Sequence, residues 1–406
     1  MNFLTLIYWI LNILSSPILI LILLLLIILI HIILFYLKDK KYIKILENFK
    51  DPESVSIRDL KETPLINIIV PAWKEGQVFF DCLNSITKLS YPNIKVIVNA
   101  GGNDETIKIA NYFSKFNNFK ILRQTGGTGR AETGKIMAIN ECLQYISEGI
   151  TYFIDADCYL TDEIILRHIY PIINENEEVI ISAGVRPLIK QEKIDLVNYF
   201  EFFRFNFPRA KFVRYHPYAI GGASTCVSYN VIKKVGKFTE GTFHATEFTR
   251  AKDMISKGFK IYCLIDYRSR IYTYYPETIS ERLDQRKRYF ENNLIFAYKN
   301  KKKMPFFKFI MIQIYSFYII LSPLLIIYHL SWFLIAVYFL FFLYLRKIRY
   351  LIFFNIVVNK EFRSKIRKRL YLKLIYYIIV ELLINIYTLL KLKNYSKSVK
   401  NNKEQN

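Results

Sequence analysis

Three long apolar stretches lie toward the two ends of the chain, at residues 3–37, 305–345 and 370–392. A helix needs about 20 apolar residues to cross the hydrocarbon core of a membrane, so each stretch is a candidate span. Ser15, Ser16 and Pro17 break the first stretch, which predicts its span at residues 18–37 with an interfacial or re-entrant piece before it. The second stretch is long enough for two spans, with a turn near residues 328–331.

Between the apolar stretches, short apolar runs alternate with segments of helical periodicity. Strands are predicted at residues 65–70, 94–99 and 120–123 and in the run that leads to Asp155, and helices at residues 76–89, 105–116 and 133–147. Strands that alternate with helices form a parallel sheet with helices on both faces. The sequence therefore predicts an α/β domain between the membrane segments, and we place it at residues 65–300.

Each predicted strand is followed by polar or glycine-rich residues. In chain order these are Pro71–Glu75, Gly101–Asp104, Gly126–Gly134 and Asp155–Asp157. Ligands of parallel α/β sheets bind at the carboxyl ends of the strands. One or two such loops would be ordinary turns, but four at one edge of a sheet indicate a binding site.

The triplet Asp155-Ala156-Asp157 is a candidate metal site. Side chains at positions i and i+2 of a strand share a face, so both carboxylates are expected to reach one hard divalent cation, Mg²⁺ or Mn²⁺, or the phosphates that it carries. Taken alone, the triplet is more often a solvated turn than a metal site. Its place after the fourth strand favours the metal interpretation.

Residues Gly129–Lys135 match the first seven positions of a P-loop, G-x-x-x-x-G-K. The eighth position, which needs a hydroxyl group for magnesium, is Ile136. A P-loop nucleotide hydrolase is therefore a distant alternative. We favour a basic loop in which Lys135, with Arg130, approaches a diphosphate at the N-terminus of a helix.

The order of these motifs resembles that of membrane-embedded family 2 glycosyltransferases of the inverting GT-A type, the group of the cellulose, hyaluronan and ceramide-sugar synthases. The resemblance covers roughly residues 65–300. It implies a GT-A nucleotide-sugar-binding domain with a mostly parallel sheet, inserted between N- and C-terminal transmembrane helices. It also implies transfer of a sugar from a nucleotide-diphosphate donor, such as a UDP- or GDP-sugar, to a lipid-linked or glycan acceptor.

On the donor side, the family motifs fall on four segments of this chain. Pro71, Ala72, Trp73 and Glu75 resemble the opening motif that holds the nucleotide. In the next motif Asp104 matches the second of two aspartates, whereas Ala100 stands where relatives have the first, a base contact. The resemblance further assigns Lys135, in a G-K-x-x-A-x-N-like helix, and Asp155 to the donor, and Asp155 with Asp157 to the metal.

On the acceptor side, counting back from Gly258 places the family's catalytic Asp at Glu247, which would be the base. Gln285, Arg288 and Tyr289 resemble Q-x-x-R-W, with Tyr in place of Trp. The resemblance implies that Arg288 binds the diphosphate leaving group and that Tyr289 stacks near the acceptor. An interface helix near residues 277–298 would carry this motif. Residues 221–225 are a weaker candidate for the acceptor pocket.

The net charge of +23 is concentrated beside the apolar segments, in the clusters Lys38–Lys44, Lys299–Lys303, Arg346–Arg349 and Lys360–Lys373. Basic residues that flank spans stay on the cytoplasmic side and bind anionic lipid head groups. The charge therefore predicts a multi-pass cell-membrane protein with residues 38–304 in the cytoplasm, not a nucleic-acid-binding protein. The five cysteines show no metal-ligand or disulfide spacing and are expected to be reduced thiols.

The remaining regions have a less definite interpretation. Residues 38–64 are predicted to be a basic linker, residues 301–393 a transmembrane hairpin with a basic amphipathic stretch and a last membrane segment, and residues 394–406 a polar tail. Glu381 and Asn385 interrupt the last segment, which is expected to be re-entrant or to lie along the interface. Because Ala100, Thr246 and Tyr289 depart from the family pattern, a catalytically inactive scaffold is the alternative function.

Overall fold

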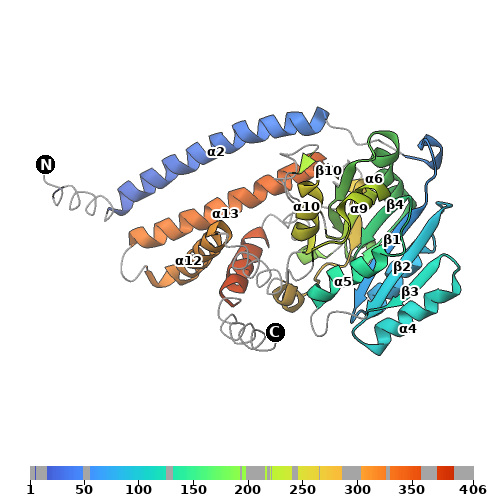
Figure 1. Cartoon of the computed structure of the whole chain (residues 1–406). Coiled ribbons are helices and arrows are strands. Elements are labelled where there is room, and N and C mark those ends of the chain that lie inside the picture. The colour runs from blue at the N-terminus through green and yellow to red at the C-terminus, as the bar shows by residue number, and fades with distance from the viewer. Residues whose placement is uncertain are drawn as a thin grey trace.

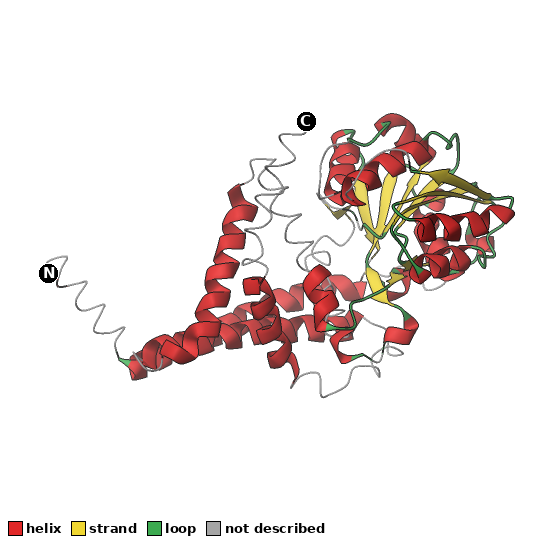
Figure 2. Ribbon diagram, turned by 90° about the horizontal axis from the view of Figure 1, so that it is seen from below, coloured by secondary structure: helices red, strands yellow, loops and turns green. Residues whose placement is uncertain are grey.

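The computed structural model describes residues 5, 16–48, 55–124, 131–192, 194–197, 215–216, 220, 222–239, 246–264, 266–285, 303–325, 330–357 and 373–387. A sheet domain lies at one end of the molecule and long helices from both ends of the sequence lie at the other (Figures 1 and 2). The predicted interfacial piece before residue 16 and the predicted polar tail at residues 394–406 lie outside the described residues, apart from residue 5.

The main sheet has the strand order β3-β2-β1-β4-β9-β6-β10-β8. Its strands are β1 (Ile66–Trp73), β2 (Ile94–Gly101), β3 (Phe119–Arg123), β4 (Ile150–Ile154), β6 (Val179–Ala183), β8 (Tyr215–His216), β9 (Ser224–Ser228) and β10 (Lys260–Leu264). The pairs β2–β3, β1–β2, β1–β4 and β6–β10 are parallel. Strand β9 runs antiparallel between β4 and β6, and β8 is antiparallel to β10. The predicted mostly parallel α/β sheet is confirmed.

Helices cover both faces of this sheet. Alternate residues of a strand therefore pack into two separate cores, one on each face. Ile68 belongs to the core with α3 (Gln77–Ile86), α4 (Asp104–Tyr112) and α6 (Asp162–Asn174). Ile69, the next residue, belongs to the core with α5 (Ala131–Leu143), α9 (Tyr229–Val235) and α10 (Thr246–Ser256). Strands β4, β6 and β9 are buried along their whole length, as expected for a sheet covered on both faces.

A smaller sheet with the order β5-β11-β7 lies beside α3 and α6. It consists of β5 (Cys158–Tyr159), β7 (Val185–Pro187) and β11 (Ile271–Thr273). Short 3-10 helices complete the domain at η1 (Ile57–Asp59), η2 (Phe113–Lys115), η3 (Ile189–Gln191) and η4 (Tyr267–Ser269). Strand β5 follows the Asp155–Asp157 turn directly, so the small sheet begins just after the carboxyl end of β4.

Side-chain caps fix where three helices begin. The side chain of Asn103 accepts a hydrogen bond from the Thr106 amide at the start of α4, Thr161 caps α6 and Ser228 caps α9 in the same way. The capped ends of α4 and α6 lie just after the carboxyl ends of β2 and β4–β5. All five cysteines are buried and lie outside any disulfide, in agreement with the expected reduced thiols.

The long helices are α2 (Pro17–Asn48), α12 (Lys303–Leu325), α13 (Leu330–Val357) and a helix at residues 373–387. Two segments of the described residues, Pro17–Leu37 and Leu330–Ile348, are long and apolar enough to cross a membrane. The first coincides with the span predicted at residues 18–37. Helix α12 ends at Leu325 and α13 begins at Leu330. Of the turn predicted near residues 328–331, residues 328 and 329 lie outside the described residues, and residues 330 and 331 are helical.

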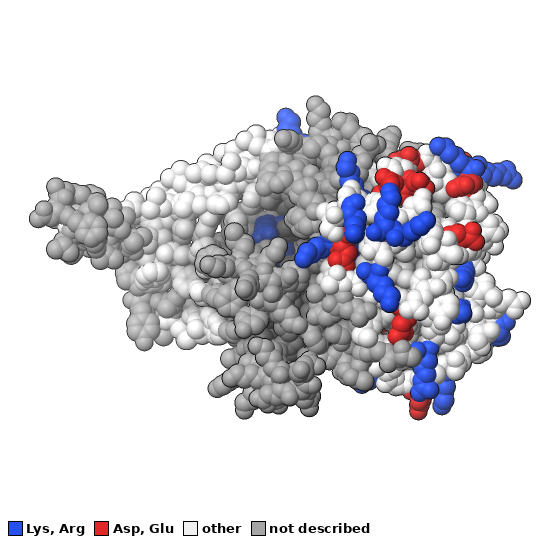
Figure 3. Space-filling view, in the orientation of Figure 1, with Lys and Arg blue, Asp and Glu red and all other residues white. Residues whose placement is uncertain are grey.

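Aromatic and polar contacts hold these helices together. His31 of α2 meets Phe342 of α13 edge to face, with ring centroids 4.9 Å apart, and the Tyr315 hydroxyl of α12 donates a hydrogen bond of 3.1 Å to the Phe339 carbonyl of α13. In Figure 3 charged side chains cover the sheet domain, whereas the described surface of the long helices in that view is almost free of them.

Candidate active site

Three charged side chains from distant parts of the sequence meet at the carboxyl edge of β4. Lys135 lies in the second turn of α5, and its Nζ is 2.6 Å from Oδ1 of Asp155 and 3.6 Å from Oε1 of Glu247. Burial of the ammonium group lowers its pKa, but the two carboxylates more than offset this and raise the pKa of Lys135 above its ordinary value. Lys135 therefore stays protonated and joins the predicted donor residue Asp155 to the predicted base Glu247.

Asp155 and Asp157 do not share a strand face as predicted. Strand β4 ends at Ile154, and residues 155–157 form the turn that leads into β5. Burial raises the pKa of Asp155, with Lys135 opposing that effect and Asp157 adding to it. The turn, and not strand pleating, decides the direction of each carboxylate, since Asp155 contacts Lys135 whereas Asp157 lines a cavity beside α3.

The carboxylate of Asp157 retains capacity for a metal ion. Among the described residues its hydrogen-bond donor is the Cys158 thiol, a weak donor, at 3.6 Å. No group of three or more His, Cys, Asp or Glu side chains close enough to hold a metal is found in the described part of the chain. One or two carboxylates with substrate phosphates are the usual ligands of Mg²⁺, so Asp157 and Asp155 fit a cation that is shared with a diphosphate.

Glu247 lies in the first turn of α10 and packs directly against Gly222, which precedes β9. A Cβ atom at position 222 would lie 2.4 Å from Oε1 of Glu247, closer than atoms approach in proteins. At position 222, therefore, only glycine is compatible with the observed position of the Glu247 carboxylate. Residues 221–225 were the weaker candidate for the acceptor pocket, and that role stays a prediction; Gly221 itself lies outside the described residues.

Sequence reasoning missed Arg250, one turn after Glu247 on α10. Its guanidinium is 5.1 Å from the ring centroid of Phe153, and the residue is 1% exposed. Its Nε, Nη1 and Nη2 atoms have no hydrogen-bond partner among the described residues. Burial lowers the pKa of Arg250, while Glu247 and Asp155 oppose that effect. A buried cation without hydrogen bonds lies beside the two carboxylates of the site.

The predicted nucleotide-binding residues Pro71, Ala72 and Trp73 form the end of β1 and do not lie in a loop after it. The backbone of Lys74 adopts φ +56° and donates a hydrogen bond of 3.1 Å to the Gly101 carbonyl. A Cβ atom at Gly102 (φ +90°) would lie 2.7 Å from the Lys74 side chain. The Gly-Gly pair thus permits the ends of β1 and β2 to approach each other closely.

The two donor-side motifs are joined by Thr106. The Glu75 amide donates a hydrogen bond of 2.7 Å to the Thr106 hydroxyl, which is also 2.9 Å from the Glu75 carbonyl oxygen. Asp104 is exposed in the first turn of α4. Ala100, where relatives have a base-contacting Asp, is buried in the core and offers no polar group. Thr106 lies two residues after Asp104, and the spacing in the sequence gave no sign of this contact.

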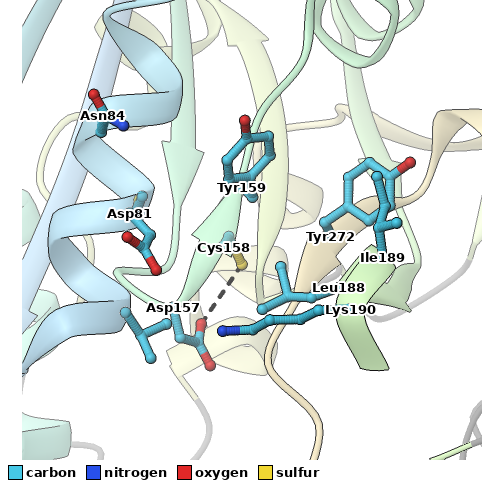
Figure 4. A pocket seen from close by; sticks show the side chains of 11 residues that line it. Asp81, Asn84, Asp157, Cys158, Tyr159, Leu188, Ile189, Lys190 and Tyr272 are labelled. Atoms are coloured by element: carbon cyan, nitrogen blue, oxygen red, sulfur yellow. Dashed lines mark hydrogen bonds between the residues drawn. The ribbon is translucent and has the colours of Figure 1, made fainter. Parts of the chain in front are cut away.

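A cavity of about 230 Å³ opens beside Asp157, between α3 and the small sheet (Figure 4). Polar and aromatic side chains line much of it, namely Asp81, Asn84, Asp157, Tyr159, Lys190 and Tyr272. Figure 4 shows the amine of Lys190 directed toward Asp157. On the Tyr272 ring, the buried guanidinium of Arg186 stacks at 3.7 Å from the centroid. Aromatic faces beside carboxylate and amide groups suit a ligand with both C–H and hydroxyl groups, such as a sugar ring.

Gln285 lies in a helix that is described from residue 279 to residue 285. The other residues of this motif, Arg288 and Tyr289, lie outside the described residues, as do Gly129 and Arg130 of the basic loop. Ile136, at the position where a P-loop carries its magnesium-binding hydroxyl, is 2% exposed in the core beneath α5. The P-loop interpretation gains no support from this position.

The fold is the α/β fold with a mostly parallel sheet that characterises GT-A glycosyltransferases, with a charged cluster at the carboxyl edge of its strands. Residues 67–234 match the family described as Glycosyl transferase family 2. This match covers less than half of the chain, and it agrees with the family that the motifs resemble.

Relatives with curated descriptions match only part of the chain. The glycosyltransferase AglE of Haloferax volcanii is 31% identical over 99 residues, which are 23% of this chain and 31% of that protein. The poly-beta-1,6-N-acetyl-D-glucosamine synthase of Staphylococcus epidermidis is 25% identical over 130 residues, 32% of this chain and 28% of the synthase. The matches thus span about a third of the length of these relatives.

One solved structure is similar over nearly the whole chain. It is the mannosyltransferase PcManGT from Pyrobaculum calidifontis in complex with GDP-Man and Mn²⁺, with a TM-score of 0.51 and 14% identity. The likeness covers 92% of this chain and 97% of that one. At this identity the similarity establishes the fold.

Proposed function

We propose that this protein is an inverting glycosyltransferase that moves a sugar from a nucleotide-diphosphate donor to a lipid-linked or glycan acceptor at the cytoplasmic face of a membrane. The observation that carries the proposal is the convergence of Asp155, Lys135 and Glu247 at the carboxyl edge of β4. An inverting transfer needs a carboxylate to act as a base and positive charge near the departing diphosphate. Both are present within one cluster of a family 2 domain.

Glu247 is the base in this proposal. Its carboxylate takes the proton of the acceptor hydroxyl while the acceptor oxygen attacks the anomeric carbon of the donor sugar. The bond from that carbon to the diphosphate oxygen breaks, the bonding electrons leave with the diphosphate, and the configuration of the carbon is inverted. Lys135, 3.6 Å from Glu247, favours the ionised carboxylate that this step requires.

The diphosphate would lie along the turn after β4. Asp157 and Asp155 would hold a divalent cation, Mg²⁺ or Mn²⁺, which when bound supplies positive charge to the leaving group. PcManGT, the similar solved structure, is a complex with GDP-Man and Mn²⁺, and this supports a UDP- or GDP-sugar donor with a divalent cation for the present chain. We place the nucleoside against Trp73 and Glu75 at the end of β1 and a sugar ring in the cavity beside Asp157.

The membrane part of the proposal rests on the long helices. Pro17–Leu37 and Leu330–Ile348 each suffice to cross a bilayer, and the charged sheet domain adjoins their uncharged surface (Figure 3). Basic clusters after the first span favour a cytoplasmic sheet domain. The proposal therefore includes a multi-pass arrangement in which the acceptor reaches the site from the bilayer.

The test is transfer of radiolabelled sugar by membranes that contain the protein, with a panel of UDP- and GDP-sugars. We expect Glu247→Gln to lower the rate by at least about 100-fold, the usual contribution of a general base. Glu178→Gln, which removes an exposed carboxylate paired with Lys234, is the matched control and should leave the rate unchanged. Near-normal transfer by the Glu247 variant would overturn the assignment of the base.

The metal is tested in the same assay. EDTA should abolish transfer and Mg²⁺ or Mn²⁺ should restore it, while Asp157→Asn should stay inactive at all metal concentrations. Transfer that resists EDTA would remove the cation from the proposal. Absence of transfer from every donor, with the fold intact, would favour the alternative of an inactive scaffold.

A further inference from the structure

The acidic residue that interrupts the last apolar segment has a specific partner in the sheet domain. Glu381 lies in the middle of the helix at residues 373–387 and is 7% exposed. An ionisable side chain in such a segment is costly unless another group neutralises it. The guanidinium of Arg282, itself 3% exposed, does so: its Nε and Nη2 atoms each lie 3.1 Å from Oε1 of Glu381.

Arg282 connects this carboxylate to Gln285, the first residue of the Q-x-x-R-W-like motif. Its Nη1 atom donates a hydrogen bond of 2.8 Å to Oε1 of Gln285. Arginine has donors and no acceptor, so Gln285 must turn its carbonyl oxygen toward Arg282. The NH₂ group of the same amide is thereby directed away from Arg282, where it can donate to a ligand. Glu381 fixes Arg282, and Arg282 fixes the orientation of Gln285.

The N-terminal end of the helix that carries Gln285 is held independently. The buried side chain of Gln191 donates hydrogen bonds of 2.8 Å to the Tyr275 carbonyl and to Oε1 of Glu277. Thr278 caps the helix by accepting a hydrogen bond of 3.2 Å from the Glu281 amide. With its start fixed by the sheet domain, the helix has one buried ionic contact to the last apolar helix, through Arg282.

The last apolar helix is also attached at both of its ends. Near its start Lys373 forms an exposed ion pair with Asp195 of the sheet domain. Near its end the Asn385 side chain donates a hydrogen bond of 3.4 Å to the Ser316 hydroxyl of α12. Glu381 and Asn385 are one helical turn apart, so the two polar residues that interrupt the apolar pattern face the rest of the protein.

We propose that Glu381 is a positioning residue for sugar transfer, which acts through Arg282 to set the amide of Gln285. The last apolar segment is then a working part of the transfer site and not a plain membrane anchor. This inference rests on the proposed function, since it assigns Gln285 to the transfer reaction. Loss of the Glu381 charge is therefore predicted to lower kcat more than it weakens donor binding.

The first measurement is a double-mutant cycle on the full-length protein in detergent, with kcat, donor KM and melting temperature measured for each variant. We expect Glu381→Gln to lower kcat by at least about tenfold while donor KM changes less than about twofold, because the substitution leaves the donor contacts in place. Added to Gln285→Ala, it should cause little further loss, since both act through one group. The charge exchange R282E/E381R should recover part of the lost kcat.

Asp195→Asn is the matched control, because it removes an ion pair between the same helix and the same domain without touching Arg282. It should leave kcat unchanged. If Glu381→Gln and Asp195→Asn lowered kcat equally and in proportion to their melting temperatures, or if Glu381→Gln added its full loss to that of Gln285→Ala, the positioning role would be wrong. A wild-type protein without transfer would refute the proposed function instead, and the melting-temperature cycle for Arg282→Met and Glu381→Gln would still report the ion pair.

Discussion

Gly222 and Glu247 are in direct contact, and the contact has room for no further atom. A Cβ atom at position 222 would lie 2.4 Å from Oε1, 2.7 Å from Cγ and 2.8 Å from Cδ of Glu247. The Glu247 carboxylate can occupy its observed position because residue 222 carries a hydrogen atom where alanine would carry a methyl group. The same position brings Oε1 to 3.6 Å from Nζ of Lys135.

Gly222→Ala is expected to displace the Glu247 carboxylate and to lower kcat. Displacement of a reacting group by about 1 Å can cost about 100-fold in rate, and we expect a loss between about 10- and 100-fold. Folding should be little affected, because Glu247 can turn toward the open site. Steady-state kinetics and a melting curve separate the two effects.

Gly184→Ala is the control for this substitution. A Cβ atom there would come no closer than 3.4 Å to a neighbouring atom, at the edge of ordinary contact. Its kcat should stay within about twofold of the wild-type value. If Gly222→Ala behaved like Gly184→Ala, the contact with Glu247 would not matter for transfer.

The second prediction concerns the buried guanidinium of Arg250. Arg250→Met keeps the length of the side chain and removes a cation that has no hydrogen-bond partner among the described residues. A buried charge without hydrogen bonds costs stability, so the variant should melt several degrees higher than the wild type in the absence of substrate. The same cation favours ionised Glu247 and Asp155, and its loss should lower the transfer rate by about tenfold.

The control for Arg250 is a half-buried arginine with an ion-pair partner. Arg268 forms an ion pair of 2.8 Å with Asp266, so Arg268→Met should lower the melting temperature and leave the transfer rate per folded molecule unchanged. Opposite signs of the two melting shifts are the expected result. A fall in melting temperature for Arg250→Met would mean that the cation is stabilising without substrate.

Local pattern predicted the sheet and the loops of the site, and missed most contacts between them. The order of strands and helices and the turn at Asp155–Asp157 depend on neighbours in the chain, so the sequence reports them. The predicted loop at Pro71–Glu75 was partly wrong, because β1 continues to Trp73. The contact of Lys135 with Asp155 and Glu247 depends on where α5 and α10 pack, which no spacing encodes.

Two residues to which we assign a role in the proposed reaction had sequence signals that indicated a different role. From the sequence alone, Arg250 is expected to be a charged residue on the polar face of an amphipathic helix. Its burial against Phe153 results from the packing of α10 against the sheet. Glu381 was visible as a break in an apolar segment, and this suggested an irregular membrane segment. Its partner Arg282 lies 99 residues away, and only the tertiary structure identifies it.

The third prediction concerns the cavity beside Asp157. Lys190 is exposed, lines this cavity and extends toward Asp157 (Figure 4). If a sugar diphosphate binds there, Lys190→Met should raise the donor KM by up to about fivefold, the range expected for an exposed charge, with kcat nearly unchanged. Lys88→Met, at an exposed position after α3, is the control and should change neither constant. An unchanged donor KM for Lys190→Met would place the donor elsewhere.

The fourth prediction is a pH dependence of stability that arises from His168. This residue of α6 is fully buried, with Nε2 2.6 Å from the Ser269 carbonyl and Nδ1 2.5 Å from the Tyr152 hydroxyl. Burial lowers its pKa to about 4, with the nearby Arg167 also lowering it. His168 is therefore neutral in the folded protein, whereas it takes up a proton near pH 6.5 when the chain is unfolded.

The unfolded state binds more protons between pH 6.5 and pH 4, so the free energy of unfolding falls as the pH falls through this window. The contribution of His168 should be complete above pH 6.5, and about 2 kcal/mol of it should be lost by pH 5. His168→Asn, which does not titrate, should show a flatter curve of melting temperature against pH between 7.5 and 5, and subtracting the two curves removes the effect of the carboxylates. Parallel curves for the two proteins would mean that His168 is already protonated in the folded state or stays neutral in the unfolded one.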